Sequence, residues 1–475
     1  MDADWPVVRL GDFCTKVGSG STPNGGANVY LEKGEICLIR SQNVHNDGFK
    51  PNGLVYITQE SADKLKNVVV EENDILLNIT GDSVARVCLA KNEYLPARVN
   101  QHVAIIRPNP EKFDSRYLRY LLVSPTMQNL LLSIASIGAT RNALTKGMIE
   151  SLEVCKPPIS VQKSIADNLE ILDLKIDVNT QTNQTLEAIA QAIFKSWFVD
   201  FEPVKAKMAV LEVGGTAEEA ERAAMCAISG KDEATLTQLQ TEQPDAYAEL
   251  AQTTALFPLA MQDSELGEIP VGWGVELLKT FGQIVCGKTP SKTQSEMFGQ
   301  DIPFIKIPDM HSSMFVVSPT EHLSEIGAAS QIKKMLPRGS ICVSCIATVG
   351  KVVITTKESQ TNQQINSIIP KFRFYTSYLY FYMLTLEKMF HDLASGGSAT
   401  LNMNTSTFSG AEIVKPSVEL LKEFDKRVQP IFREIENRLN QNIGLSELRD
   451  TLLPKLLSGE MDLSQVVEVV DEMTV

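Results

Sequence analysis

The chain of 475 residues repeats one sequence plan after about 260 residues, and this repeat constrains the fold more than any other feature. Short motifs of the first half recur in the second half in the same order and at nearly the same spacing. The matched motifs are Trp5 and Trp273, Gly20-Ser-Thr22-Pro23 and Gly287-Lys-Thr289-Pro290, Ile39-Arg40 and Ile305-Lys306, Asn100-Gln101 and Asn362-Gln363, and Glu153-Val-Cys-Lys156-Pro157 and Glu412-Ile-Val-Lys415-Pro416. Chance matches would not stay in register, so we infer two diverged copies of one module.

Each copy begins with short strands and continues into helices. β-Branched runs separated by Gly, Asn, Asp and Pro predict short strands up to residue 108 in the first copy and residue 370 in the second. Helical segments are expected at about 115–132 and 376–393. This order of elements predicts an α+β protein in which each module is mixed α/β with short strands.

A long amphipathic helix closes each copy. Apolar residues recur with the 4-3 spacing of a heptad; Ser160 is the expected N-cap of the first helix, and Pro430 is expected to kink the second or mark its start. A helix of about 38 residues is ~57 Å long, which exceeds the span of a module of this size. Each stripe could be buried on its own module, but this length favours burial of the two stripes on each other, with Asn183 and Asn442 fixing their register.

The charge is unevenly distributed along the chain. The net charge is −14; residues 205–270 hold 12 acidic and 4 basic residues, and residues 460–475 hold 5 acidic residues and no base. Two segments in comparable parts of the copies are basic, because residues 83–146 carry 9 Lys and Arg against 3 acids and residues 331–373 carry 7 against 1. Paired basic segments suit a protein that neutralises DNA phosphates, although two solvated faces of a mixed surface would give the same pattern.

The repeat and the charge pattern together divide the chain into segments. We expect an acidic, partly helical and mobile insertion between the copies and an acidic tail after the second. The expected segments are a first module at 1–158, a long helix at 159–204, the insertion at 205–270, a second module at 271–416, a second long helix at 417–459 and the tail at 460–475.

Several classes of function lack the sequence features that they need. The chain shows no signal peptide and no apolar run of about 18 residues, and its eight cysteines are scattered, which together favour a reducing cytosol. A Walker-type string ends at Lys288-Thr289, but its interior resembles a strand and Pro290 follows at once, so we expect no phosphate loop. Cys342 and Cys345 have no second pair, so we expect no zinc site. We therefore expect no catalytic centre, metal or cofactor in this chain.

Three longer motifs add to the repeat. They are Ile193-Phe-Lys-Ser-Trp197-Phe-Val-Asp200-Phe-Glu-Pro203, Asp263-Ser-Glu-Leu-Gly-Glu-Ile-Pro-x-Gly-Trp273 and Leu448-Arg-Asp-x-Leu-Leu-Pro454-Lys-Leu-Leu-Ser-Gly459. With the Gly-x-Thr-Pro motif near the start of each module, they resemble the specificity subunits of bacterial type I restriction–modification systems. The resemblance extends from Trp5 to Gly459, and the segments around Thr140 and Thr400 depart from the family pattern in detail.

The resemblance implies a fold and a division of labour. Each module would be a target-recognition domain that reads one half of a split double-stranded DNA site, and the two modules would be related by a pseudo-twofold. The two long helices would form an antiparallel coiled coil that acts as a spacer. The chain itself would be non-catalytic and cytoplasmic.

The resemblance also implies partners. Two methyltransferase subunits, which carry the S-adenosylmethionine chemistry, would dock on the helices and the conserved motifs, and restriction and motor subunits would join them. A stripe of large apolar side chains in these motifs is expected to be exposed as the docking surface. It consists of Phe194, Trp197, Phe198, Leu452 and Leu453.

Polar side chains in the loops of each module are the candidates for DNA contact, since Arg, Lys, Asn and Gln recognise base edges and phosphates. In the first module they are Thr22, Arg40, Gln42, Asn43, Asn78, Arg86 and Arg141. In the second module they are Lys288, Thr289, Lys306, Ser344, Lys351, Asn362 and Gln363. The repeated Asn-Gln pair has a structural alternative as a turn cap. Loop residues that differ between the modules are the better base readers, since the two half-sites should differ.

Two other functions compete with DNA recognition. A coiled-coil scaffold without a DNA role would show no salt-dependent binding to duplex DNA. An NTP-binding enzyme based on the Walker-type string would be stabilised against unfolding by nucleotide.

Overall fold

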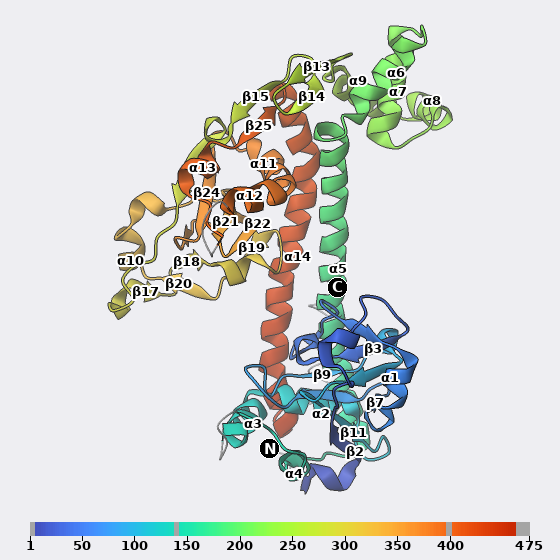
Figure 1. Ribbon diagram of the computed structural model, residues 1–475, viewed down its shortest axis with the longest axis vertical. Coiled ribbons are helices and arrows are strands. Elements are labelled where there is room, and N and C mark those ends of the chain that lie inside the picture. The colour runs from blue at the N-terminus through green and yellow to red at the C-terminus, as the bar shows by residue number, and fades with distance from the viewer. Residues whose placement is uncertain (1–4, 137–141, 396–400, 462–475) are drawn as a thin grey trace. The chain divides into compact units, whose positions relative to one another are not determined.

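The computed structural model describes residues 5–136, 142–395 and 401–461. The chain forms two compact units, of which unit 1 comprises residues 1–178 and 442–475 and unit 2 comprises residues 179–441. Two long helices, α5 (Ile159–Phe198) and α14 (Val418–Ser458), are each continuous through the unit boundary (Figure 1). Each unit therefore contains one sheet-rich module and one stretch of both long helices.

The module of unit 1 contains two four-stranded sheets, a two-stranded ribbon and a short hairpin of β4 (Val44–His45) and β5 (Gly48–Phe49). The first sheet has the antiparallel order β2 (Cys14–Ser19), β11 (Val103–Pro108), β8 (Ile75–Asn78) and β9 (Val87–Leu89). The second has the order β6 (Val55–Ile57), β3 (Ile36–Ile39), β10 (Ala97–Val99) and β7 (Val69–Val70), with β3 and β10 parallel. The ribbon pairs β1 (Val7–Arg9) with β12 (Glu153–Cys155). The short β-branched runs of the sequence account for these strands.

Helices pack on both sheets, and the second of them shares a core with the long helices. The module's helices are α1 (Gln59–Asp63), α2 (Ser115–Val123), α3 (Pro125–Ser136) and α4 (Lys146–Glu150). Helix α2 begins after Asp114, whose carboxylate accepts hydrogen bonds from the N–H groups of Arg116 and Tyr117. Buried Tyr117 and Leu118 of α2 belong to the same apolar core as residues 165–172 of α5 and residues 445–456 of α14.

The module of unit 2 repeats this plan with small differences at the sheet edges. Its first sheet has the order β16 (Gly282–Cys286), β24 (Ile365–Pro370), β21 (Ile341–Ile346), β22 (Thr348–Thr355) and β19 (Phe315–Val316). Its second sheet has the order β17 (Phe298–Gly299), β20 (Glu321–Leu323), β18 (Ile302–Ile305) and β23 (Gln360–Thr361), and its ribbon pairs β15 (Gly274–Leu277) with β25 (Glu412–Lys415). The parallel pair β18–β23 corresponds to β3–β10. The predicted duplication is therefore a duplication of topology.

The helices of this module also correspond to those of unit 1. They are α10 (Glu325–Ala329), α11 (Tyr375–Thr385), α12 (Glu387–Ala394) and α13 (Thr405–Ser409). Tyr378 on α11 corresponds to Tyr117 on α2, and both hydroxyl groups donate to a backbone carbonyl of the two-stranded ribbon, at Val414 and Cys155.

The long helices pair antiparallel within each unit. In unit 2, the Asn179 amide donates to the Gln441 side chain at 2.8 Å and the Asn183 amide donates to the Ile435 carbonyl at 3.3 Å. In unit 1, the Asn442 amide donates to the Ile176 carbonyl at 3.4 Å. Along the pair, the residue numbers on α14 decrease as those on α5 increase, which is an antiparallel arrangement. The asparagines lie at the contact between the two helices, as the sequence predicts.

The expectation that Ser160 caps the first long helix is wrong, and so is one of the two alternatives for Pro430, that it marks the start of the second. Helix α5 begins at Ile159, directly after Pro158, whose carbonyl accepts the Gln162 N–H at 3.0 Å, so Ser160 lies inside the first turn. Helix α14 starts at Val418 and continues through Pro430. Buried Val428 and Phe432, on either side of this proline, anchor the helix to its core.

The segment between the modules is a helical subdomain, with helices where the sequence suggests partial helicity and mobility. Its elements are α6 (Glu202–Glu212), α7 (Ala217–Ser229), α8 (Glu233–Glu242), α9 (Pro244–Ala255) and the hairpin of β13 (Met261–Ser264) and β14 (Gly267–Pro270). Its buried Lys207 ammonium donates to the Glu221 carboxylate at 2.6 Å and to the carbonyls of Thr254 and Phe257 at 2.8 and 2.9 Å. Lys426 of α14 pairs with Glu249 at 2.5 Å, which fastens the subdomain to the helix pair of unit 2.

Candidate nucleic-acid interface

The Gly-x-Thr-Pro motif of unit 1 lies against the Asn-Gln motif. A Cβ built on Gly20 would overlap the backbone carbonyl of Asn100, so only glycine fits at this crossing. The Thr22 hydroxyl donates to the side-chain oxygen of Gln101. The Asn100 N–H donates to the Ile39 carbonyl at 3.0 Å, which brings the end of β3 to the same place.

Unit 2 contains the same arrangement. A Cβ built on Gly287 would overlap the carbonyl of Asn362, and the Thr289 hydroxyl donates to the Gln363 side chain at 2.7 Å. The Asn362 N–H donates to the Ile305 carbonyl at 3.3 Å. The repeated motifs of the sequence therefore meet at one loop cluster in each unit.

The asparagines of the Asn-Gln motifs are turn caps. Asn100 and Asn362 are buried, and their side-chain oxygens accept the backbone N–H groups of His102 and Gln364, both at 3.1 Å. This is the structural alternative that the sequence left open, and it occupies the Asn362 side chain. Gln363, like Gln101 in unit 1, is exposed.

Arg40 and Lys306 occupy corresponding positions at the start of a short 3₁₀ turn. The Arg40 N–H donates to Asn43 Oδ1 at 3.0 Å, and the Lys306 N–H donates to Asp309 Oδ2 at 2.9 Å. The Arg40 guanidinium donates to the Gly53 carbonyl at 2.6 Å, whereas the Lys306 ammonium pairs with Glu321. Both side chains are half-buried, on turns of the same design with different surroundings.

Three candidate readers are fully buried and hold the loops together. The Asn43 amide donates to the Lys50 carbonyl at 2.9 Å, and the Asn78 amide donates to the Ser41 carbonyl at 2.8 Å. The Ser344 hydroxyl accepts the Lys351 N–H at 2.9 Å. As placed in the structure, these side chains stabilise the loops from within.

The other candidates reach the surface. Gln42 and Lys288 are exposed, and Thr22, Arg86, Thr289 and Lys351 are half-exposed. Gln42 donates to the Gly53 carbonyl at 3.1 Å, and Lys351 lies 3.3 Å from the Glu387 carboxylate. Arg141 lies outside the described residues.

Sequence reasoning missed His102, which extends the loop cluster of unit 1. Its Nδ1 lies 2.6 Å from the Thr80 hydroxyl, and its Nε2 lies 2.9 Å from the Gln101 amide. The only signal in the sequence was its position directly after Asn100-Gln101.

The expectation that the large apolar side chains of the conserved motifs are exposed is wrong. In unit 2, Phe194, Trp197 and Phe198 are each at most 2 % exposed, because α11, α14 and the helical subdomain cover them; the Trp197 and Phe257 rings lie 5.2 Å apart. In unit 1, Leu452 and Leu453 lie in the core that α14 shares with α5. The heptad stripe and the aromatic residues beside it serve the internal seam.

The Walker-type string does not form a phosphate loop. Its first residues are strand β16, the Lys288 N–H donates to the Thr361 carbonyl at 2.9 Å, and residues 287–294, all described, form no helix. A phosphate loop needs the N–H groups of a helix N-terminus directly after it. The NTP-binding alternative therefore loses its structural basis.

Comparisons with known proteins agree with the two-unit plan. A family model described as "Type I restriction modification DNA specificity domain" matches residues 2–188 and 270–445. The chain is 42% identical to the type I restriction enzyme HindI specificity subunit of Haemophilus influenzae over 467 residues, which cover 97% of this chain and all of that one. The chain belongs to the type I restriction–modification specificity family.

A more distant relative and a solved structure also match. The MjaIX specificity subunit of Methanocaldococcus jannaschii is 24% identical over 98% of this chain and 95% of its own. A crystal structure of the S subunit of a type I system from M. genitalium is 14% identical with a TM-score of 0.48, covering 95% of this chain and 96% of that one.

The chain is thus a specificity subunit, which recognises the DNA target of its system and assembles with the other subunits of the complex. It is the recognition component and not the catalytic one. None of the helices in the described part of the chain is long and apolar enough to span a membrane.

Proposed function

We propose that the loop cluster of each unit reads one half of a bipartite site on double-stranded DNA. The observation that carries this proposal is that both units build the same Gly-x-Thr-Pro and Asn-Gln crossing and surround it with different accessible side chains. A shared frame with variable side chains suits two half-sites of different sequence.

The accessible side chains divide into two roles. The Thr-Gln pair and Lys288 suit sequence-independent contacts to phosphates, because the pair is common to both units and a lysine is a point charge. Arg40, Gln42 and Arg86 in unit 1 and Lys306 and Lys351 in unit 2 differ between the units and suit base contacts.

We further propose that two methyltransferase subunits, with S-adenosylmethionine bound in them, dock on the outward face of α5, and that restriction and motor subunits join the complex in the cytoplasm. In unit 1, Ile171, Leu174 and Val178 are 41–56 % exposed and recur at spacings of three and four. The corresponding residues of α14, such as Arg433, are not exposed large apolar residues. A partner subunit would bury this apolar stripe.

The reading proposal is tested by mapping modified bases in the genome of cells that carry this chain with its methyltransferase partner. We expect a motif of two short halves separated by a gap of unspecified bases. Arg40→Ala should relax base preference in one half and Lys306→Ala in the other, with a loss of about 1–3 kcal/mol of discrimination at the affected position.

The exposed Lys64→Ala in unit 1 is the matched control, since Lys64 lies at the end of α1 and, among the described residues, pairs with Glu60 of the same helix. It should leave the motif unchanged. A motif without a gap, or one in which Arg40→Ala alters both halves, would contradict the division of reading between the units.

A further inference from the structure

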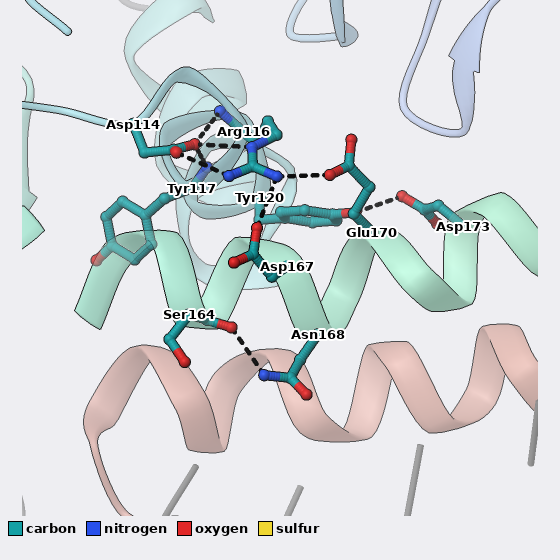
Figure 2. Close-up of polar contacts among 9 residues, drawn as sticks. All are labelled: Asp114, Arg116, Tyr117, Tyr120, Ser164, Asp167, Asn168, Glu170 and Asp173. Carbon is teal, nitrogen blue, oxygen red and sulfur yellow. Dashed lines mark hydrogen bonds and ion pairs between the residues drawn. The ribbon is translucent and has the colours of Figure 1, made fainter. Parts of the chain in front are cut away.

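One carboxylate in unit 1 collects donors from two other elements. Asp173 of α5 accepts hydrogen bonds from Arg119 at 3.0 Å and Tyr120 at 2.7 Å, both on α2, and from Arg449 of α14 at 2.8 Å. Figure 2 shows Tyr120 of α2 reaching Asp173, while the neighbouring Glu170 is bonded to Arg116. We call Asn46, Arg119, Tyr120, Asp173 and Arg449 the Asp173 network.

The network extends to the loops that carry candidate readers. The second arm of the Arg119 guanidinium donates to the Asn46 carbonyl at 2.5 Å. Asn46 forms the turn between β4 (Val44–His45) and β5 (Gly48–Phe49), directly after the turn that contains Gln42. The Asn46 side chain in turn accepts the Val87 N–H at 2.9 Å, next to Arg86. Arg119 therefore links both reading segments of unit 1 to the long helices.

The charges in this network depend on one another. The Arg119 side chain is only 8 % exposed, and Asp173 is its one ion-pair partner in the described part of the chain. Burial opposes ionisation of Asp173, but Arg119 and Arg449 outweigh it and hold the pKa of Asp173 below its usual value. Removal of the negative charge would leave a buried guanidinium uncompensated, so Arg119 would be expected to shift toward water.

Unit 2 fills the corresponding positions with aromatic rings. Tyr380 and Phe381 on α11 replace Arg119 and Tyr120, and Phe432 on α14 replaces Asp173. The Phe432 ring lies 5.9 Å from Phe381 and 5.5 Å from Phe315, between ring centroids. A charged side chain also reaches this group, since the Tyr380 hydroxyl donates to the Glu187 carboxylate at 2.5 Å. Unit 2 therefore provides an internal comparison in which packing replaces ion pairs.

We propose that Asp173 is a positioning residue that holds the reading loops of unit 1 at a fixed place on the helix pair and thereby sets the fidelity of one half-site. This inference rests on the proposed reading function. Asp173 itself does not touch DNA; it acts through Arg119 and Asn46.

The test compares Asp173→Asn with Glu170→Gln in the complete complex. Both changes replace a carboxylate on α5 by its amide, but Glu170 bonds Arg116 at 2.6 Å and does not reach the loops. In genome-wide maps of modified bases, Asp173→Asn should lower the preference for the correct bases about tenfold in the half read by unit 1, the effect of losing one charged hydrogen bond. The other half should be unchanged, and Glu170→Gln should resemble the wild type.

Further variants separate positioning from general stability. Tyr120→Phe removes only one hydrogen bond to Asp173 and should cause a smaller loss in the same half, which keeps the test valid if Asp173→Asn does not fold. Phe432→Leu should weaken the other half. Equal losses in both halves with a lower melting temperature, or no loss from Asp173→Asn and Tyr120→Phe, would overturn the proposal.

Arg86→Ala in the same experiment distinguishes a failure of the positioning role of Asp173 from a failure of the proposed reading function. If Arg86→Ala and Arg40→Ala relax one half and Asp173→Asn does not, only the positioning role fails. If neither arginine variant changes any half, the proposed reading function fails first.

Discussion

At the scale of single residues, polarity selected loop positions but did not predict the direction in which the side chains point. Arg40 and Asn43 are three positions apart in one turn, yet Arg40 reaches the surface and Asn43 is fully buried. An amide can recognise a base or satisfy backbone groups with equal chemistry. The choice depends on carbonyls such as that of Lys50, which only the folded loop brings near. The turn-cap alternative for Asn362 is confirmed. The repetition of the Asn-Gln motif in both copies was the signal for it.

Gly287 supports a prediction at this scale. Gly287→Ala places a methyl group on the Asn362 carbonyl and should lower the free energy of unfolding by about 1–3 kcal/mol, as overpacking does. Gly18→Ala is the control, since a Cβ built there has no neighbour within 4 Å. Denaturant unfolding of the purified chain measures both. Equal free energies of unfolding for the two variants would show that the Gly-x-Thr-Pro and Asn-Gln motifs are less tightly packed than in the structure.

At the scale of elements, periodicity predicted most helices and strands well. The helicity predicted for the 205–270 insertion is seen in α7, which begins after Thr216 and ends at Gly230 in a left-handed conformation with φ of 65°. The packing of this segment was not predictable, because Lys207 finds its partners about 14 to 50 residues away. The docking stripe was misjudged for a related reason: a heptad stripe marks a buried face but does not say whether a partner helix or a partner subunit buries it.

The exposed face of α5 gives a prediction about assembly. Leu174→Gln should weaken the association with the methyltransferase subunit by about 2 kcal/mol, roughly 30-fold, because a 56 % exposed leucine would lose its burial in the complex. Stability of the free chain should hardly change. Arg433→Gln, at the corresponding position of α14, is the control. Titration calorimetry with the partner subunit measures the affinity, and an unchanged affinity for Leu174→Gln would remove this face from the interface.

At the scale of the whole molecule, the duplication carried the prediction furthest. Matching motifs in a constant order implied that the two copies share one strand topology. The parallel pairs β3–β10 and β18–β23, which occupy corresponding places in the two copies, confirm this. The two copies nevertheless attach to the long helices by different physics, through the Asp173 network in unit 1 and through aromatic rings around Phe432 in unit 2. Sequence alignment of the copies matches Asp173 with Phe432, but it does not reveal that both residues join a module to the helix pair.

The paired helices lead to a prediction about the gap between the half-sites. Asn183 bonds the Ile435 carbonyl, so insertions of four residues after Gln184 in α5 and after Glu434 in α14 lie opposite each other. Each lengthens its helix by ~6 Å and adds about one turn, which keeps the seam nearly in phase. One base pair of DNA spans about 3.4 Å. The gap in the modified motif should therefore lengthen by one or two base pairs while both halves keep their sequence.

The same maps of modified bases decide whether spacing and reading are separate properties. Arg40→Ala and Lys306→Ala should change a half and leave the gap alone, whereas the paired insertion should do the reverse. If the insertion altered the bases in either half, the helix pair would be part of the reading surface. If it left the gap unchanged, the DNA or the loops would be absorbing the added length, and the distance along α5 and α14 would not be what sets the spacing of the target.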